Sequence, residues 1–206
     1  MATTPTDEDT GSAAQRERRK RILDATLALS SKGGYDAVQM RTVAERADVA
    51  VGTLYRYFPS KIHLLVSALE RELGRFQDKT ARGPVPGDTA YERAKRILAQ
   101  TTRAMQRDPN MTEAMTRAFM FADASVSAEV DAVGRLMDTM FAKALFAAEP
   151  TDEQLAAARV ISDVWLANLV AWVTRRASAT DVANRLDLTA RLLLNHEYAE
   201  AALAGT

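Results

Sequence analysis

The stretch from Val38 to Lys61 constrains the fold of this chain more than any other, because its apolar residues follow a helical spacing on both sides of a tight turn. These apolar residues are Val43, Ala44, Ala47, Val49, Leu54 and Phe58. They predict a helix, a turn and a second short helix from about Ala50 to Tyr57. The second helix would present small and hydrogen-bonding side chains outward, which suits the DNA major groove. We therefore expect a helix-turn-helix.

A further helix is expected before this unit, from about Ala14 to Ser31, with an apolar stripe on one side. Its first two turns carry the basic residues Arg16, Arg18, Arg19, Lys20 and Arg21. Cations at a helix N-terminus oppose the helix dipole at a cost of about 0.3–1 kcal/mol each. Contact with DNA phosphates would offset this cost, and a solvated charged face is the alternative. We predict phosphate contacts from Arg16, Arg18 and Arg19.

The rest of the chain has helical periodicity and lacks the alternating pattern of β-strands, so we predict an all-α fold of about nine helices. Three helices would form a small DNA-binding head over residues 14–60. Residues 61–206 would form a larger body for ligand binding and dimerisation. The polar, acidic residues 1–13 are expected to be disordered.

Caps and helix breakers set the expected boundaries of the body helices. Thr151 with Gln154 is a capping box, and Pro109 suits the first position of a helix. The expected helices span residues 61–80, 88–107, 108–121, 126–148, 151–175 and 178–198. The stretch 81–88, rich in proline and glycine, is expected to be a flexible loop.

Methionine and aromatic residues recur in the body at helical spacing and indicate a pocket for a bulky apolar ligand, because methionine adapts to irregular shapes. Ordinary core packing is the alternative for each of them. The residues expected to line the pocket are Leu69, Leu73, Met111, Met115, Phe119, Met137, Phe141, Trp165, Asn168, Leu169 and Trp172. Asn168 would be a polar anchor within it, unless it faces solvent.

The last two predicted helices carry more apolar surface than one packed side requires. This surface comprises Leu166, Val170, Val173, Leu186, Leu192 and Leu193. Two copies of the chain would pack there as a four-helix interface, which predicts a homodimer. Dimerisation would place two recognition helices about one turn of DNA, or a multiple of it, apart.

Composition narrows the class of protein. The formal net charge is zero, but the head is basic and the remainder weakly acidic, which fits phosphate attraction at one end. The absence of cysteine excludes disulfides and thiolate zinc sites and suits a reducing cytoplasm. No apolar run reaches the roughly 20 residues of a membrane helix, and no secretory signal is present. We expect a cytoplasmic protein without a membrane partner.

Catalysis has little support in the sequence. The chain has two histidines, His63 and His196, and shows no paired acid and base. Asp163 is a lone carboxylate beside Trp165, and such groups are usually caps or salt-bridge partners. We therefore expect no catalytic residue, metal or cofactor. An enzyme acting on the ligand and an architectural DNA-binding protein with a filled body are the alternatives.

The helix-turn-helix resembles the DNA-binding signature of TetR-family repressors. The matching motifs are Thr42-Val43-Ala44, the run from Val51 to Phe58, and Ser60-Lys61. The resemblance implies that Arg41 contacts a base. It implies that Val51, Gly52, Thr53 and Tyr55 face bases and backbone, and that Tyr57 and Lys61 contact phosphates. Thr42 and the outward-facing Arg56 complete the expected DNA-binding set.

Several further segments resemble the TetR-family repressors of sterol degradation. They are Ala14 to Ala25, Thr112 to Ala118, Phe121 to Ser125, Val160 to Leu166 and Thr174 to Val182. The resemblance implies a homodimeric repressor that binds an inverted-repeat operator in double-stranded DNA. It also implies release by a coenzyme A (CoA) thioester of a cholesterol side-chain breakdown product. A repressor of the same family that senses another lipid, such as a fatty acyl-CoA, is the alternative.

Overall fold

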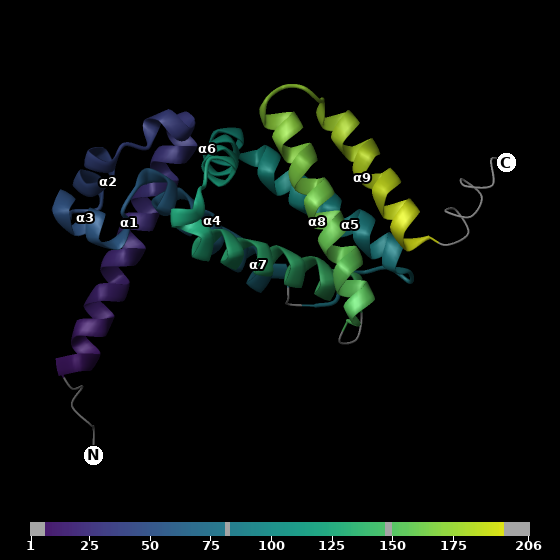
Figure 1. Cartoon of the computed structure of the whole chain (residues 1–206), viewed down its shortest axis with the longest axis horizontal. Helices are drawn as coiled ribbons and strands as arrows, with labels where there is room; N and C mark the ends of the chain where they lie inside the picture. The colour runs from purple at the N-terminus through teal and green to yellow at the C-terminus, as the bar shows by residue number, and fades with distance from the viewer. Residues whose placement is uncertain (1–6, 81–82, 147–149, 196–206) are drawn as a thin grey trace, which may run out of the picture.

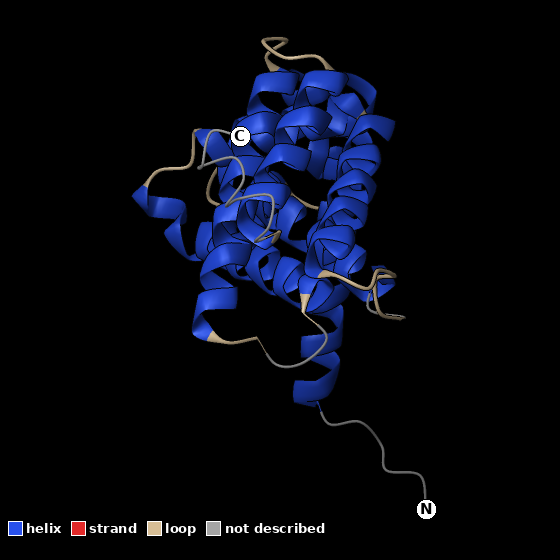
Figure 2. Cartoon of the chain, turned by 90° about the vertical axis from the view of Figure 1, so that its right-hand side faces the viewer, coloured by secondary structure: helices blue, strands red, loops and turns tan. Residues whose placement is uncertain are grey.

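The computed structural model describes residues 7–80, 83–146 and 150–195. Within these ranges the chain forms nine α-helices and one short 3-10 helix, with no strand. Figure 1 shows an elongated molecule with α1, α2 and α3 at one end and α5, α8 and α9 at the other. Figure 2 shows the helices joined by loops. The predicted all-α fold, with a three-helix head and a larger body, is confirmed.

The head consists of α1 (Asp7–Ala37), α2 (Met40–Arg46) and α3 (Val51–Tyr57). The first helix begins earlier than the expected Ala14, so residues 7–13 of the predicted disordered tail are helical. Residues 1–6 lie outside the described part of the chain. The core of the head is made by the buried side chains Ile22, Leu23, Val38, Val43, Ala44, Leu54 and Phe58.

Two glycines interrupt the helical geometry of α1 near its end. Gly34 has φ 67° and ψ −158°, a conformation that is essentially restricted to glycine. Together with Gly33 it bends the chain, so the last residues of α1 turn toward the body. The expected end of the first helix near Ser31 therefore corresponds to this bend.

A tight turn joins α2 to α3, as the sequence predicts. The backbone N–H of Val49 donates to the carbonyl of Ala44 at 3.0 Å and closes the end of α2. Asp48 has φ 53°, a left-handed conformation that aspartate tolerates better than most residues. Val43 on α2 and Leu54 on α3 are both fully buried, so the two helices share one core.

The body contains α4 (Lys61–Thr80), α5 (Ala90–Arg107), α6 (Pro109–Met120), η1 (Ala124–Val126), α7 (Ser127–Leu145), α8 (Asp152–Val173) and α9 (Ala179–Leu194). Capping boxes at Thr89, Thr151 and Ser178 begin α5, α8 and α9 because each side chain accepts from the backbone three residues on. The expected ends near Ala148 and Tyr198 lie outside the described residues.

The fold places α4 and α6 between the two halves of the molecule. α6 packs against α1 of the head, and α4 packs against α1, α6 and α7. Figure 1 shows α4 running from the head into the body. Both helices therefore contact the head and the rest of the body at once.

α8 corrects the expectation that no segment is apolar enough to cross a membrane. By length and composition it meets that requirement, with a mean hydropathy of 1.3 over its most apolar window. It nevertheless packs against α6, α7 and α9 within the body and carries the charged residues Arg159 and Asp163. We interpret it as a body helix with apolar side chains on more than one side.

Candidate DNA-binding surface and ligand cavity

α3 presents one buried and one exposed side. Leu54 is fully buried, whereas the Tyr55 side chain is 47% exposed and Arg56 is exposed as well. Gly52 is exposed, and a methyl group added there would meet no atom within 4 Å. Val51, Thr53 and Tyr57 are half-buried along the edges of the helix. This arrangement leaves the middle of the exposed side open to a close approach by another molecule.

The start of α1 lies beside α3. Arg18 and Gln15 share a shallow hollow with Arg56 and Tyr57, so cations from both helices form one surface. The Arg19 guanidinium lies 5.6 Å from the centre of the Phe58 ring, which positions that side chain next to the end of α3. Near the start of α1, Arg16 is exposed. At the start of α2, Arg41 is exposed and Thr42 is half-buried.

Lys61 is half-buried, and its ammonium packs on an aromatic ring of the head. Its ammonium lies 3.7 Å from the centre of the Tyr35 ring, and the Arg117 guanidinium lies 4.4 Å from the same ring. Burial lowers the pKa of Lys61, and the neighbouring carboxylates of Asp36 and Glu113 partly offset this change. The expected phosphate contact would require the ammonium to leave Tyr35.

These residues belong to a joint between the end of α1, the start of α4 and the outer side of α6, which we call the head–body joint. The Tyr35 backbone N–H donates to Glu113 Oε2 at 2.9 Å. The Asn110 amide donates to the carbonyl of Ser31 at 3.1 Å, and Arg117 pairs with Asp36 at 3.5 Å. The opposite side of α6 faces the interior of the body.

That interior contains a cavity of about 500 Å³ enclosed by residues of α4, α5, α6, α7 and α8. The predicted pocket residues in its wall are Leu69, Leu73, Met111, Met115, Phe119, Met137, Trp165 and Leu169. The wall also includes apolar residues outside the predicted pocket set: Phe76, Ala104, Met105, Val133 and Leu166. For Leu166 this corrects the prediction, which placed it at the dimer surface. Phe76, Val133 and Leu166 lie within one turn of predicted residues on the same helices, so one-turn spacing was the available signal for them. Ala104 and Met105 lie on α5, for which no pocket residue was predicted.

Three predicted pocket residues lie outside the cavity wall. Phe141 is fully buried behind it, with its ring centre 6.4 Å from that of Trp165. Asn168 is turned into the body, where its amide nitrogen donates to the Val164 carbonyl at 2.8 Å and its Oδ1 has no partner. Trp172, one turn further along α8, borders a separate hollow near the end of that helix.

Charged and polar side chains form one side of the cavity wall. The basic residues there are Arg75, Lys79, Arg103 and Arg107. Glu72 is the one carboxylate among the lining residues, and it pairs with Arg75 at 2.8 Å. Thr116 also borders the cavity and is almost completely buried. This cationic rim was not predicted, because in the sequence alone a charge that borders a cavity looks the same as an ordinary solvated charge.

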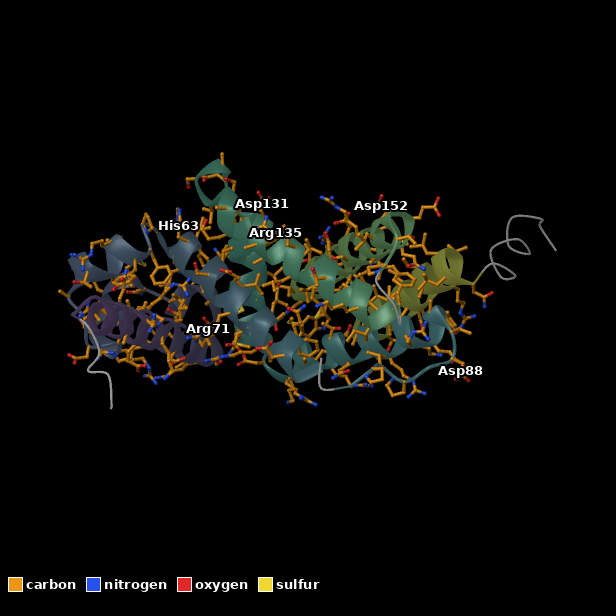
Figure 3. All side chains as sticks on the ribbon, turned by 90° about the horizontal axis from the view of Figure 1, so that it is seen from below. His63, Arg71, Asp88, Asp131, Arg135 and Asp152 are labelled. Atoms are coloured by element: carbon orange, nitrogen blue, oxygen red, sulfur yellow. The ribbon has the colours of Figure 1, made fainter. Side chains whose placement is uncertain are left out.

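Of the residues considered for catalysis, His63 and Asp163 form no catalytic arrangement in the described part of the chain. His63, labelled in Figure 3 near the head, has Nε2 3.0 Å from the carbonyl oxygen of Ser125 and Nδ1 2.9 Å from Ser60 Oγ. Since a carbonyl only accepts, Nε2 carries the hydrogen. His63 thus connects the start of α4 to η1. Asp163 is exposed, and His196 lies outside the described residues. Across those residues, no group of three potential metal ligands occurs.

The fold combines a helix-turn-helix head with a helical body that contains a cavity. Residues 22–68 match the family of bacterial regulatory proteins called the tetR family, and residues 87–193 match the tetracyclin repressor-like C-terminal domain. The chain therefore belongs to the TetR family.

Curated relatives make the assignment narrower. The chain is 72% identical over 193 residues to the HTH-type transcriptional repressor KstR of Rhodococcus jostii, covering 94% of this chain and 90% of the relative. It is 64% identical to KstR of Mycobacterium tuberculosis, covering 93% of this chain and 87% of the relative. The chain is thus a TetR-family transcriptional repressor and not an enzyme.

Solved structures share the fold. A TetR transcriptional regulator from Rhodococcus sp. RHA1 superimposes with a TM-score of 0.81 at 30% identity, covering 89% of this chain and 98% of the other. FadR from Bacillus subtilis in complex with stearoyl-CoA superimposes with a TM-score of 0.61 at 19% identity, covering 85% and 97%. At that lower identity the likeness concerns the fold alone.

Proposed function

We propose that this repressor controls genes of sterol, in particular cholesterol, degradation, and that a CoA thioester of a sterol side-chain intermediate releases it from DNA. The similarity to repressors named KstR extends over more than nine-tenths of the chain, including the body. Because the body contains the cavity, a match there supports a shared class of effector. The same similarity supports an inverted-repeat operator in double-stranded DNA.

The proposed DNA contacts divide into two groups. Base and groove contacts come from Arg41, Thr42, Val51, Gly52, Thr53 and Tyr55. Phosphate contacts come from Arg16, Arg18, Arg19, Arg56, Tyr57 and Lys61. The shared surface of Arg18, Arg56 and Tyr57 supports the second group, because cations from two helices lie together beside α3. For Lys61 the contact requires a change at the head–body joint.

The observation that carries the effector class is the cavity with its apolar wall and cationic rim. A rigid apolar skeleton would fill the region around Met115, Met137 and Trp165. The basic residues of the rim would attract an anionic group at the other end of the same molecule. A CoA thioester of a sterol combines an apolar skeleton and phosphates in one ligand.

Release follows from the two helices that border both the cavity and the head. Leu69 and Leu73 of α4 and Met111 and Met115 of α6 line the cavity, while α4 and α6 also pack against α1. A ligand that spreads these helices would rotate each head and change the distance between two heads in a dimer. A 10-fold to 100-fold preference for the spread state corresponds to about 1.4–2.7 kcal/mol of coupling.

Dimerisation is supported by the outer surface of α8 and α9. Its exposed apolar side chains are Leu155, Val160, Leu188, Leu192 and Leu193. Of the residues predicted for this surface, Leu192 and Leu193 are exposed, whereas Leu186 is buried in the core and does not belong to it. Exposed apolar side chains of this kind on neighbouring helices are typical of protein interfaces. A homodimer through this surface would carry two heads for two operator half-sites.

A second candidate effector is a fatty acyl-CoA. FadR proteins from Bacillus subtilis and Thermus thermophilus share the fold and were solved with stearoyl-CoA and lauroyl-CoA. Those proteins are only 19% and 20% identical to this chain. The fold is therefore compatible with an acyl-CoA. The residues that line the cavity determine whether a sterol or a fatty acyl group binds.

The test starts by recovering the operator through selection of bound fragments from a random DNA pool. The expected sequence is an inverted repeat whose half-sites lie about one helical turn, or a multiple of it, apart. The complex is then titrated with sterol-CoA and fatty-acyl-CoA thioesters while fluorescence anisotropy of the DNA is followed. Release by the sterol thioester alone supports the proposal. Release by the fatty-acyl thioester alone supports the second candidate, and release by neither contradicts both.

A further inference from the structure

A second hollow adjoins the cavity at the end of α4. It is bordered by α4, by the loop of residues 83–86 and by α5. Lys79, Gln100 and Arg103 belong to the walls of both hollows, so the cavity and this groove are adjacent. The remaining wall of the groove comprises Gly83, Pro84, Val85, Pro86, Glu92, Lys95, Arg96 and Ala99.

The groove has an excess of positive charge. Lys79, Lys95, Arg96 and Arg103 face one carboxylate, that of Glu92. The Glu92 carboxylate already accepts the backbone N–H groups of Asp88 at 2.7 Å and Thr89 at 3.4 Å. Among the four cations, only Lys95 pairs with a described carboxylate, Asp187, at a distance of 3.9 Å. Cations concentrated in a concave surface repel one another, and an anionic ligand relieves this repulsion.

DNA is not the anion that fits this position. Asp88, which lies just beyond the loop of the groove, is at the end of the molecule away from the head in Figure 3. Figure 1 likewise shows α5 in the body, on the other side of α6 from α3. The groove therefore lies in the part of the molecule away from α3, out of reach of the DNA that α3 would contact. A small-molecule anion fits this position better.

We infer that this groove binds the phosphates of a nucleotide carried by the effector, while the acyl part occupies the cavity. This inference rests on the proposed function, which supplies the acyl part. Arg96 and Arg103 supply planar donors that suit phosphate oxygens, and Lys79 adds a point charge. Pro84 and Pro86 stiffen the opposite wall because their φ angles are fixed. The groove thus selects a CoA thioester over the corresponding free acid.

The experiment measures binding to the intact protein by isothermal titration calorimetry. The probes are a sterol side-chain CoA thioester, the matching free sterol acid and inorganic pyrophosphate. The variants are Arg96→Ala and the double variant Arg96→Ala with Arg103→Ala. The matched control is Arg135→Ala, an exposed arginine on α7 that Figure 3 shows well away from Asp88.

Removing Arg96 should weaken thioester binding about tenfold, which is the effect of losing one charged hydrogen bond. The double variant should lose more, and the control should match the wild type. Affinity for the free acid should stay the same in Arg96→Ala, because Arg96 borders the groove and not the cavity. Retained free-acid binding also shows that a variant is folded. Thioester affinity should fall more steeply with added salt than free-acid affinity.

Other outcomes overturn the inference in distinguishable ways. If the wild type binds the thioester and both variants bind it equally well, the groove assignment fails while the proposed effector stands. If the variants lose thioester and free acid by the same factor, the residues do not contact the phosphates. Competition by pyrophosphate as strong as that of the thioester would indicate a site for free phosphates. If the wild type binds no thioester, the inference and the proposed effector both fail.

Discussion

The ammonium of Lys61 lies 3.7 Å from the centre of the Tyr35 ring, and this contact connects the residue that opens α4 to the end of α1. Arg117 of α6 lies 4.4 Å from the centre of the same ring. The aromatic ring therefore joins three helices, one of the head and two that border the ligand cavity. Because cations bind the face of an aromatic ring electrostatically, the joint depends on the ring itself and not on the phenol oxygen.

Replacing Tyr35 with leucine should lower the free energy of unfolding by about 1–2 kcal/mol, since two cation–π contacts of about 0.5–1 kcal/mol each are lost. Tyr35→Phe keeps the ring and should stay within about 0.5 kcal/mol of the wild type. Urea unfolding followed by circular dichroism measures both. If the two variants lose the same stability, the ring contacts with the cations contribute nothing.

Gly34→Ala should be more damaging than its small change in volume indicates. An added Cβ would lie 2.7 Å from Glu113 Oε2, and the backbone has φ 67°. We expect a loss of about 1–3 kcal/mol from the strained backbone. Gly74→Ala on α4 is the matched control, because its added Cβ meets nothing within 4 Å and alanine favours a helix by about 1 kcal/mol. Thermal unfolding should therefore shift in opposite directions for the two variants.

The head was predictable because local signals agree there. The spacing of Val43, Leu54 and Phe58 sets the buried side, and all three are buried in the structure. The position of Lys61 was not predictable in the same way. Its partner Tyr35 lies on α1 and the second cation, Arg117, on α6, so the contact exists only after three helices have packed.

The cavity likewise could be predicted only in part, because its wall forms when several helices pack together. Helical spacing grouped Met111 and Met115 of α6 and Met137 of α7, which border the cavity, since residues one turn apart share a side. Spacing alone could not separate the wall from what lies behind it, so Phe141 was included although it supports Trp165 from the core. It also could not distinguish Arg103, which borders the cavity, from a solvated arginine. That distinction depends on where neighbouring helices end.

Asp138 on α7 should destabilise the folded protein at neutral pH. Burial raises the pKa of its carboxyl, the nearby Asp163 raises it further, and Arg159 partly opposes this change. A carboxyl whose pKa is higher in the folded state binds its proton more tightly there. Stability therefore increases as the pH falls through the raised pKa, and the cost of ionisation is present above it. Asp138→Asn removes that cost and should raise the urea midpoint at pH 7.

The gain from Asp138→Asn should disappear below pH about 3.9, where the carboxyl is protonated in the unfolded chain as well. Asp131→Asn on the same helix is the control, because Asp131 is exposed and lies at the surface in Figure 3. It should change stability by no more than about 0.5 kcal/mol at either pH. A gain for Asp138→Asn that is equal at both pH values would contradict the role of its charge.

The two tryptophans report separately on the cavity. Trp165 borders it and is 4% exposed, whereas Trp172 lies outside its wall near the end of α8. A ligand in the cavity changes the surroundings of Trp165, so its binding should alter the tryptophan emission. Trp172→Phe should keep most of this change, and Trp165→Phe should lose most of it. Titration of each variant with the sterol-CoA thioester, monitored by emission intensity, measures the effect. If the change depends instead on Trp172, the ligand occupies the far end of α8 and not the cavity between α4 and α6.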